Sequence, residues 1–264
     1  MPHPRALALD ALLLADPAEK AAAARALHAA LDPAAIDPAW TAAEPPGLPE
    51  RPARPRLVPP KDVPTHSPRT LPGRAALLHA IAHIEFNAVN LALDAAWRFP
   101  DLPAAFYADW LRVAAEEALH FTLLRDHLRS LGHDYGDFDA HDGLWAMAEK
   151  TKGDVLARMA LVPRTLEARG LDATPPLQAK LAAAGDARAV AILDVILRDE
   201  VGHVAIGNRW YRWLCERAGV DAEAHYPLLA EAHGAPRPRA PFNVEARQAA
   251  GFSEVELGWL RQQG

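Results

Sequence analysis

Cysteine is nearly absent from this sequence: the 264 residues include one, Cys215. A lone cysteine excludes a disulfide within one chain and is typical of a protein of the reducing cytoplasm, the location we expect. Uninterrupted apolar runs of the roughly 18 residues that a membrane span needs are also missing, so no membrane association is expected. The short apolar start is cut by Asp10, which does not fit a signal peptide.

Positive charge is scarce as well. The chain has 28 Lys and Arg against 34 Asp and Glu, a formal net charge of −6, so there is no strong nucleic-acid signal. The most basic local cluster comprises Arg51, Arg54, Arg56, Lys61 and Arg69. This cluster is typical of a solvated linker, and the alternative is a contact for an anionic substrate or partner.

Proline is unevenly distributed, and its distribution divides the chain. The stretch 33–72 holds 12 of the 24 prolines, which excludes a regular helix or a central strand there. We predict an extended strap at this point, preceded by two short helices within residues 1–31. The predicted division is residues 1–72 for the N-terminal helices and strap, 73–219 for a helix bundle, and 220–264 for a helical tail packed on the bundle.

Half of the residues are hydrophobic, and their spacing predicts an all-α fold. Four long helices are expected over about 71–99, 103–131, 142–168 and 186–218. Asp101 and Asp186 are predicted to cap the second and the fourth of these helices. The third is expected to break near Gly153, to be kinked by Pro163 and to end at Gly170. A connection over residues 172–185 then leads to the fourth helix.

Two stretches within these helices share the pattern acid-Glu-x-x-His: 116–120 and 199–203. Residues three apart on an α-helix differ by only about 60° in direction and about 4.5 Å in height, so one metal ion can bridge the Glu and the His. A single such motif is typical of a surface salt bridge or a core histidine. Here the motif occurs twice, each time on an apolar helix face where a bare carboxylate is costly.

A further glutamate precedes each motif at nearly the same distance. Glu85 lies 32 residues before Glu117, and Glu167 lies 33 residues before Glu200. One Glu on a first helix and Glu-x-x-His on the next, given twice, is the ligand set of a dinuclear site in a four-helix bundle. The predicted metal ligands are therefore Glu85, Glu117, His120, Glu167, Glu200 and His203.

Ligands of this kind favour two iron ions, with manganese as the alternative metal, because carboxylates and single imidazoles suit these metals better than zinc. The acids directly before the motif glutamates, Glu116 and Asp199, are candidates for accepting the second N–H of a ligand histidine. Salt bridges at the surface are the alternative for both. No catalytic residue is assigned beyond the metal site.

The pattern resembles the ferritin-like superfamily of di-iron carboxylate proteins. The segments 114–121, 163–172 and 198–203 are also similar to a bacterial family of ferritin-like proteins, domain of unknown function 455, which is related to di-iron tRNA hydroxylases. The resemblance covers most of the chain after about residue 55. It implies a ferritin-like four-helix bundle with a proline-rich N-terminal extension and extra C-terminal helices.

The function expected from the site and the resemblance is a di-iron oxidoreductase that activates O2, most simply a hydroxylase or oxygenase. Its substrate would be a small molecule or a modified nucleoside, and an electron-donor protein is an expected partner. The alternatives are a ferritin-like iron-binding or ferroxidase protein and a manganese catalase-like peroxide scavenger. We also expect the tail to lie near the open end of the site and to gate a pocket for an organic substrate.

Overall fold

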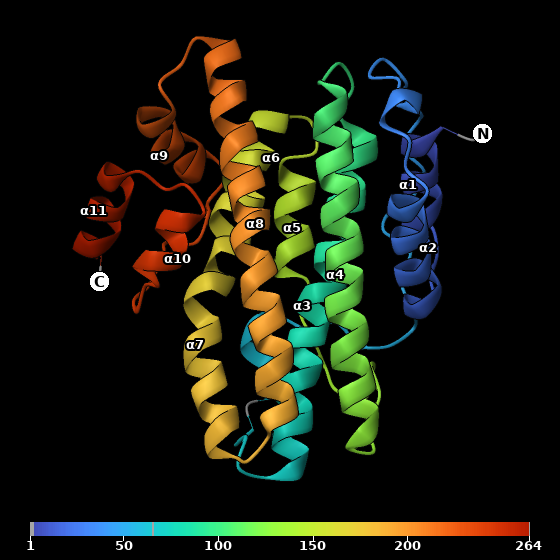
Figure 1. Ribbon diagram of the computed structural model, residues 1–264, viewed down its shortest axis with the longest axis vertical. Coiled ribbons are helices and arrows are strands. Elements are labelled where there is room, and N and C mark those ends of the chain that lie inside the picture. Colours follow the sequence, from blue (N-terminus) through green and yellow to red (C-terminus); the bar gives the residue numbers. More distant parts are fainter. Residues whose placement is uncertain (1–2, 65, 264) are drawn as a thin grey trace. The chain divides into compact units, whose positions relative to one another are not determined.

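A computed structural model describes residues 3–64 and 66–263. The regular secondary structure of these residues consists of helices, without any strand. One isolated bridge joins Leu57 to Ala140. The all-α class predicted from the sequence is confirmed. Contacts divide the chain into two compact units, Met1–Gly143 and Leu144–Gly264, each of which holds one pair of long helices (Figure 1). The sequence-based boundaries at residues 72 and 219 stay a prediction.

The first unit is built on a pair of long helices, α3 (Leu71–Arg98) and α4 (Ala104–Ser130), that pack along each other (Figure 1). Two shorter helices cover this pair: α1 (Pro4–Leu12) packs on α3, and α2 (Pro17–Ala29) packs on α4. Asp16 caps α2 by accepting hydrogen bonds from the backbone of residues 18 and 19, as its place before Pro17 predicts.

The expected cap of α4 is wrong. Pro103 occupies the N-cap position, and Asp101 lies in the preceding turn with a φ of 60°. In that turn the Asp101 N–H donates to the carbonyl of Pro38, at 2.9 Å, so this residue shapes the link between the two helices. The Tyr107 hydroxyl closes the same turn by donating to the carbonyl of Phe99.

The proline-rich strap forms only two short 3₁₀ turns, η1 (Pro33–Ala35) and η2 (Pro60–Asp62). Two buried cations of the N-terminal helices hold it. The Arg5 guanidinium donates to carbonyls of the strap at Pro38 and Trp40 and to others at the end of α3. The Lys20 ammonium donates to the carbonyl of Glu50 and to the side chain of Asn90. Burial lowers the pKa of Lys20 to about 7. The strap is therefore fixed through hydrogen bonds that are charge-assisted at Arg5, and at Lys20 when its amine is protonated.

The second unit is built on α7 (Ala168–Ala183) and α8 (Ala187–Ala218), which pack on each other (Figure 1). Two shorter helices, α5 (Gly143–Lys150) and α6 (Val155–Leu161), precede α7, and the break between them confirms the interruption predicted near Gly153. As predicted, Asp186 caps α8 by accepting from the Ala189 N–H, and Gly219 ends it at a φ of 68°.

The expected end of the third long helix at Gly170, with a connection over 172–185, is wrong. Instead α7 continues through Gly170 and through the pair Pro175–Pro176. Proline has no N–H, so the carbonyl of Leu171, four residues before Pro175, loses its helical donor. The side chain of Asn243 donates to that carbonyl at 3.2 Å. A hydrogen bond from the distant tail thus replaces the one that proline removes.

Between α6 and α7 the chain forms a π-helical segment, η3 (Val162–Glu167). The irregularity predicted at Pro163 is confirmed in this form, and π segments of one turn are frequent at functional sites. The Thr165 hydroxyl donates to the carbonyl of Ala160 at 2.8 Å, which satisfies a backbone acceptor within the widened turn.

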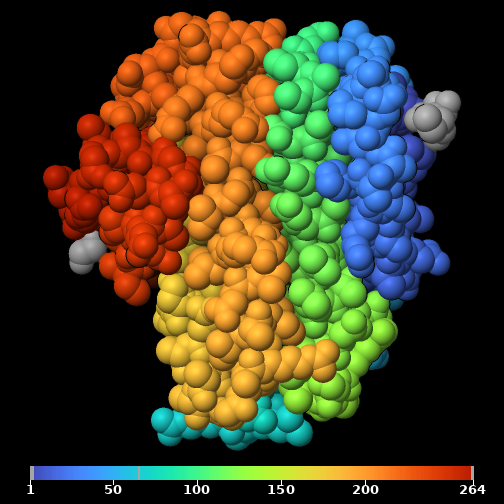
Figure 2. Space-filling view, in the orientation of Figure 1, coloured from blue at the N-terminus to red at the C-terminus, as the bar shows by residue number. Residues whose placement is uncertain are grey.

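The C-terminal part of the second unit comprises α9 (Ala222–Ala232), α10 (Val244–Ala249) and α11 (Glu254–Gln263). Figure 2 shows the residues of α10 and α11, in red, directly against α8, in orange. Side chains of Phe252, Leu257 and Leu260 form a buried cluster with Ala168, Leu171 and Val204. The tail therefore packs on α7 and α8, as its amphipathic pattern predicts.

Among the described residues, α3 alone is long and apolar enough to cross a membrane. Its most apolar stretch is 78% buried inside the structure, which is the pattern of a core helix of a soluble protein. The cytoplasmic location stays a prediction.

We predict that Gly207→Ala destabilises the fold through the π segment. A Cβ at Gly207 would lie 2.5 Å from Cβ of Pro163, and a rigid proline ring cannot move aside without shifting the backbone. The expected loss in the free energy of unfolding is about 1–3 kcal/mol. Urea unfolding of the metal-free protein, followed by circular dichroism, measures it.

Gly202→Ala is the matched control, since it lies on the same helix and a Cβ there meets nothing within 4 Å. This control should gain about 0.5–1 kcal/mol from the better helix propensity of alanine. Equal effects of the two substitutions would contradict the close approach at Gly207.

Candidate metal centre

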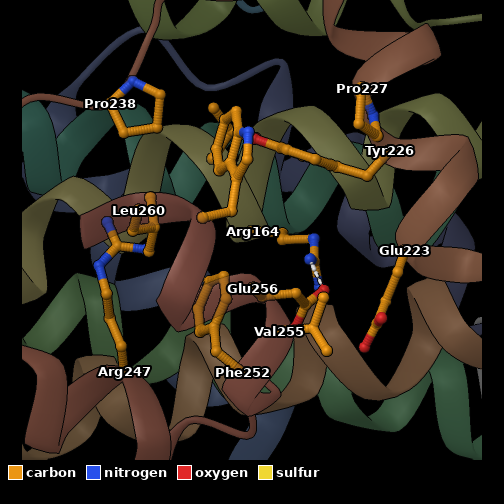
Figure 3. Close-up of a pocket in the computed structure, with 12 residues that line it drawn as sticks. Arg164, Glu223, Tyr226, Pro227, Pro238, Arg247, Phe252, Val255, Glu256 and Leu260 are labelled. Atoms are coloured by element: carbon orange, nitrogen blue, oxygen red, sulfur yellow. Dashed lines mark hydrogen bonds and ion pairs between the residues drawn. The ribbon is translucent and has the colours of Figure 1, made fainter. Parts of the chain in front are cut away.

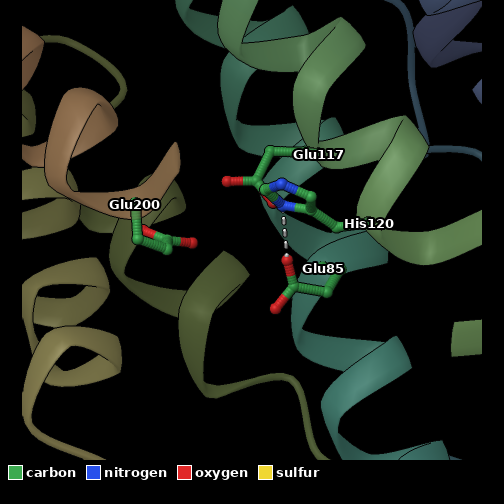
Figure 4. A group of neighbouring side chains, drawn as sticks. All are labelled: Glu85, Glu117, His120 and Glu200. Atoms are coloured by element: carbon green, nitrogen blue, oxygen red, sulfur yellow. Dashed lines mark hydrogen bonds and ion pairs between the residues drawn. The ribbon is translucent and has the colours of Figure 1, made fainter. Parts of the chain in front are cut away.

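Three of the predicted ligands lie together in the first unit. Glu85 is on α3, and Glu117 and His120 are on α4. The Nδ1 atom of His120 lies 3.1 Å from a carboxylate oxygen of Glu85 and 3.3 Å from one of Glu117 (Figure 4). All three side chains are buried, with 3%, 0% and 0% of their surface exposed. They form a group that could hold a metal ion.

Helix periodicity explains why these side chains meet. On α3, Leu78, Ile81, Glu85 and Val89 share the stripe that faces α4, and the acid takes one apolar position in it. On α4, the spacing of three residues points Glu117 and His120 the same way. Because the surrounding positions are apolar and packed, the polar group is enclosed rather than solvated.

Burial and the neighbouring charges shift the pKa values of Glu85 and His120 in this group. Burial, and then the neighbouring charge of Glu117, raise the pKa of Glu85 to about 7. Burial alone would lower the pKa of His120, but the hydrogen bonds and charges of Glu117 and Glu85 outweigh it and raise the pKa to about 12. Two buried carboxylates therefore keep a cation between them, which is the imidazolium when a proton is bound.

The second unit holds the other three predicted ligands. Glu200 and His203 lie on α8 and are buried, with Nδ1 of His203 3.9 Å from a carboxylate oxygen of Glu200. Glu200 is the fourth side chain in Figure 4. Glu167 ends the π segment and is partly buried. A Cβ at Gly170, one turn beyond Glu167, would lie 4.0 Å from the carboxyl carbon of Glu200, so Glu200 faces α7.

Each unit thus contains a buried Glu-x-x-His pair, but the geometry of the two pairs differs. In the first unit Nδ1 of His120 is within 3.3 Å of two carboxylates, whereas in the second unit Nδ1 of His203 is 3.9 Å from Glu200. The structure brings Glu85 to Glu117 and His120, and it brings Glu200 to His203. The union of the two halves into one six-ligand centre stays a prediction.

The donor set fits iron or manganese. It consists of carboxylate oxygens and imidazole nitrogen without any thiolate, since the one cysteine of the sequence, Cys215, is on the last turns of α8. Hard oxygen ligands with one imidazole per metal suit these ions, whereas structural zinc sites favour sulfur and nitrogen.

The two acids proposed to orient the histidines have contacts at the surface. Glu116 lies 3.9 Å from the exposed Arg112. Asp199 accepts two hydrogen bonds from Arg198, at 2.8 and 3.0 Å. These are the salt-bridge contacts of the alternative interpretation, and a role in orienting a ligand histidine stays a prediction.

Two further histidines of α3 bind the loop over residues 132–142 rather than the acidic group. The His79 Nε2 atom accepts from the Gly136 N–H at 2.9 Å, and burial lowers its pKa to about 4. His83 lies 2.8 Å from the Tyr135 hydroxyl, and burial lowers its pKa to about 3. Both are neutral at pH 7 and hold this loop against α3.

The basic cluster of the strap is partly engaged by the same loop. Arg51 pairs with Asp142 at 2.8 Å, and Arg56 pairs with Asp139. These pairs are consistent with a linker that is held to the unit by charge.

Comparisons with known proteins place the chain in a family without naming its site. The family model described as protein of unknown function (DUF455) matches residues 13–258. The chain belongs to this family. An uncharacterized protein of Haemophilus influenzae is 55% identical over 216 residues, which cover 79% of this chain and 75% of the relative. No solved structure matches the chain.

The sequence patterns did not predict a role for Arg164, a buried polar side chain of the second unit. Arg164 is 3% exposed on the π segment, three residues before Glu167, and is surrounded by aromatic rings. An arginine inside an apolar run beside a predicted ligand was the signal that could have found it.

We predict that Glu117→Ala abolishes metal binding by the first unit, whereas Glu116→Ala retains it. The two acids are adjacent in the sequence, but the buried Glu117 faces His120 and the partly exposed Glu116 faces Arg112. Iron content of the purified variants, measured by plasma emission spectroscopy after loading and desalting, gives the comparison.

The expected loss of stability for metal-free Glu117→Ala is small for so buried a residue, because its removal relieves the crowding with Glu85 that raises the pKa of the latter. A Glu117→Ala variant that holds as much iron as the Glu116→Ala control would contradict the assignment.

Proposed function

We propose that the two halves join into one centre that holds two iron ions, and that the protein is an O2-dependent oxidoreductase of the hydroxylase or oxygenase type. The observation that carries the proposal is the buried group of Glu85, Glu117 and His120, together with the second buried Glu-x-x-His pair, Glu200 and His203. One Glu and one Glu-x-x-His pair from each half is the ligand set that ferritin-like di-iron proteins use.

When bound, such a metal pair supplies two redox equivalents for the activation of O2. The chain's own residues supply the rest of the site. Glu85 and Glu117 provide negative charge that is buried away from water, and the imidazole Nδ1 atoms of His120 and His203 point toward carboxylates. Glu85, Glu117 and His120 would hold a metal ion in place of the proton that His120 carries between the two carboxylates.

The enclosing apolar side chains matter for this chemistry as much as the ligands. Leu78, Val89 and Leu124 are fully buried around the first half, and Val204 is fully buried beside the second. A dry, packed surrounding strengthens electrostatic interactions within the site and protects reactive species from water.

Two features favour an oxidoreductase over an iron-storage protein. The proline-rich strap is tied down by Arg5 and Lys20, and the tail is packed on α7 and α8, so much helix surface is covered by the chain itself. A storage cage needs such surfaces for subunit contacts. The tail also forms a cavity of a kind that iron storage does not require.

The expected substrate is an organic small molecule or a modified nucleoside, and an electron-donor protein would return the centre to its reduced state. The same ligands could also hold manganese in place of iron, and the alternative function is then that of a catalase-like protein with peroxide as its substrate.

The experiment is anaerobic loading with ferrous iron followed by exposure to O2. We expect two iron ions per chain, rapid consumption of O2 and a new near-ultraviolet absorption of the oxidised pair. Glu200→Ala should abolish both the second metal and the O2 reaction, and Glu116→Ala should retain them.

Fewer than two metal ions per chain after loading with iron or manganese would contradict the proposal. A shell of many subunits in size-exclusion chromatography with light scattering would favour storage instead. Rapid release of O2 from peroxide by the manganese-loaded protein would favour the catalase-like alternative.

A further inference from the structure

The second unit contains a cavity of about 140 Å³ between the π segment, α9 and the later part of the tail, from Pro238 to Leu260 (Figure 3). Aromatic side chains form much of its wall: Tyr226 comes from α9, and Phe252 and Trp259 come from the tail. The rings of Tyr226 and Trp259 meet edge to face, 6.5 Å apart. An apolar cavity of about 150 Å³ is large enough to bind benzene, so this one has room for a single ring.

Arg164 gives the cavity a buried polar group. Its guanidinium donates through Nη1 to the side chain of Asn208, at 2.9 Å. Through Nη2 it donates to Glu256, as Figure 3 shows. The third donor position, Nε, is buried and has no acceptor among the residues that the structure describes. An unmet buried donor costs about 1–3 kcal/mol, and a ligand with an acceptor oxygen would recover that free energy.

The charges around the cavity decide which kind of acceptor fits. Arg164 is already paired with Glu256, and Arg247 is already paired with Asp172 at 2.6 Å. The carboxylate of Glu223 lines the cavity as well. Arg212 also pairs with Glu256, at 3.3 Å, so three guanidinium groups and three carboxylates balance around the cavity. A further anion would therefore meet the carboxylates of Glu223 and Glu256 without an excess of positive charge, whereas a neutral carbonyl or ether oxygen meets only the open donor.

The cavity and the second half of the candidate metal centre share one segment of the chain. Arg164 and Thr165 line it, and both lie on the π segment that ends at Glu167. Thr165 shares a hydrogen bond of 2.9 Å with the hydroxyl of Tyr226 in the cavity wall. A ligand in the cavity therefore contacts the backbone segment that presents a predicted metal ligand.

We infer that this cavity binds a neutral, single-ring organic compound that carries an acceptor oxygen, and that it recognises the ring of the substrate. The second part of this inference rests on the proposed function. The aromatic wall supplies contact with the face and edges of the ring, and the Arg164 Nε–H fixes its orientation.

Benzamide is the probe, with benzoate and toluene as matched compounds that add a charge or remove the acceptor. Binding to the full-length, metal-free protein is measured by ligand-observed NMR titration. We expect benzamide to bind at least about tenfold more tightly than either of the other two compounds.

Val255→Trp is the variant that should block the cavity. Val255 lines it but is 66% exposed, so a larger side chain can be accommodated without entering the core. Leu228→Trp is the control, since Leu228 is 60% exposed on α9 and does not line the cavity. Benzamide binding should weaken at least about tenfold in the first variant and stay unchanged in the control.

Absence of benzamide binding to the wild-type protein, equal binding by Val255→Trp, or preference for benzoate or toluene would each overturn the inference. Glu117→Ala, which should lose metal, should still bind benzamide. A protein that binds benzamide but never takes up iron would therefore refute the proposed function and leave the binding site standing, whereas the reverse result would refute the site alone.

The link to the metal centre has its own readout. In the iron-loaded protein, benzamide should change the absorption spectrum of the oxidised centre in the wild type and in Leu228→Trp, but not in Val255→Trp. An unchanged spectrum at a benzamide concentration that fills the cavity would show that the cavity does not serve the metal centre.

Discussion

Buried like charges are the constraint on which the site depends. Glu85 and Glu117 place two carboxylates around one imidazole within a helix pair that is otherwise apolar. Such a group is stabilised by a cation among the oxygens or by protonation of one carboxylate, because removing charged groups from water is costly. The protonated His120 is that cation without a metal, and its raised pKa of about 12 expresses the demand of the two acids. The group is therefore already arranged to accept positive charge.

The second unit depends on close backbone packing and on hydrogen bonds from the tail. A π segment precedes α7 and packs so closely against α8 that only glycine fits at position 207. The tail then supplies what the irregular backbone lacks, with Asn243 bonded to the carbonyl of Leu171 and Arg247 paired with Asp172. The tail is thus part of the structure that positions Glu167, and the aromatic cavity beside Arg164 follows from the same packing.

Local patterns in the sequence predict most helices and the burial of Glu85, Glu117 and His120 side by side, because these features depend on spacing along one helix. The Glu-x-x-His spacing and the caps at Asp16 and Asp186 are of this kind. The errors arise where distant residues decide. Gly170 and the following prolines do not end α7, because a side chain more than 65 residues away takes over a lost hydrogen bond. Asp101 adopts a turn conformation because the chain reverses there against Pro38. The buried Arg164 and its cavity depend on the tail, which no short-range pattern reveals.

In the proposed function both halves hold one pair of metal ions, and X-ray absorption spectroscopy of the iron-loaded protein tests this arrangement. Two ions held by shared carboxylates should show an iron–iron distance of about 3.5–4 Å, together with oxygen and nitrogen neighbours and no sulfur. Glu200→Ala, which alters only the second half, should abolish the iron–iron signal. A spectrum of fully loaded protein that shows isolated iron ions without an iron neighbour would contradict the account.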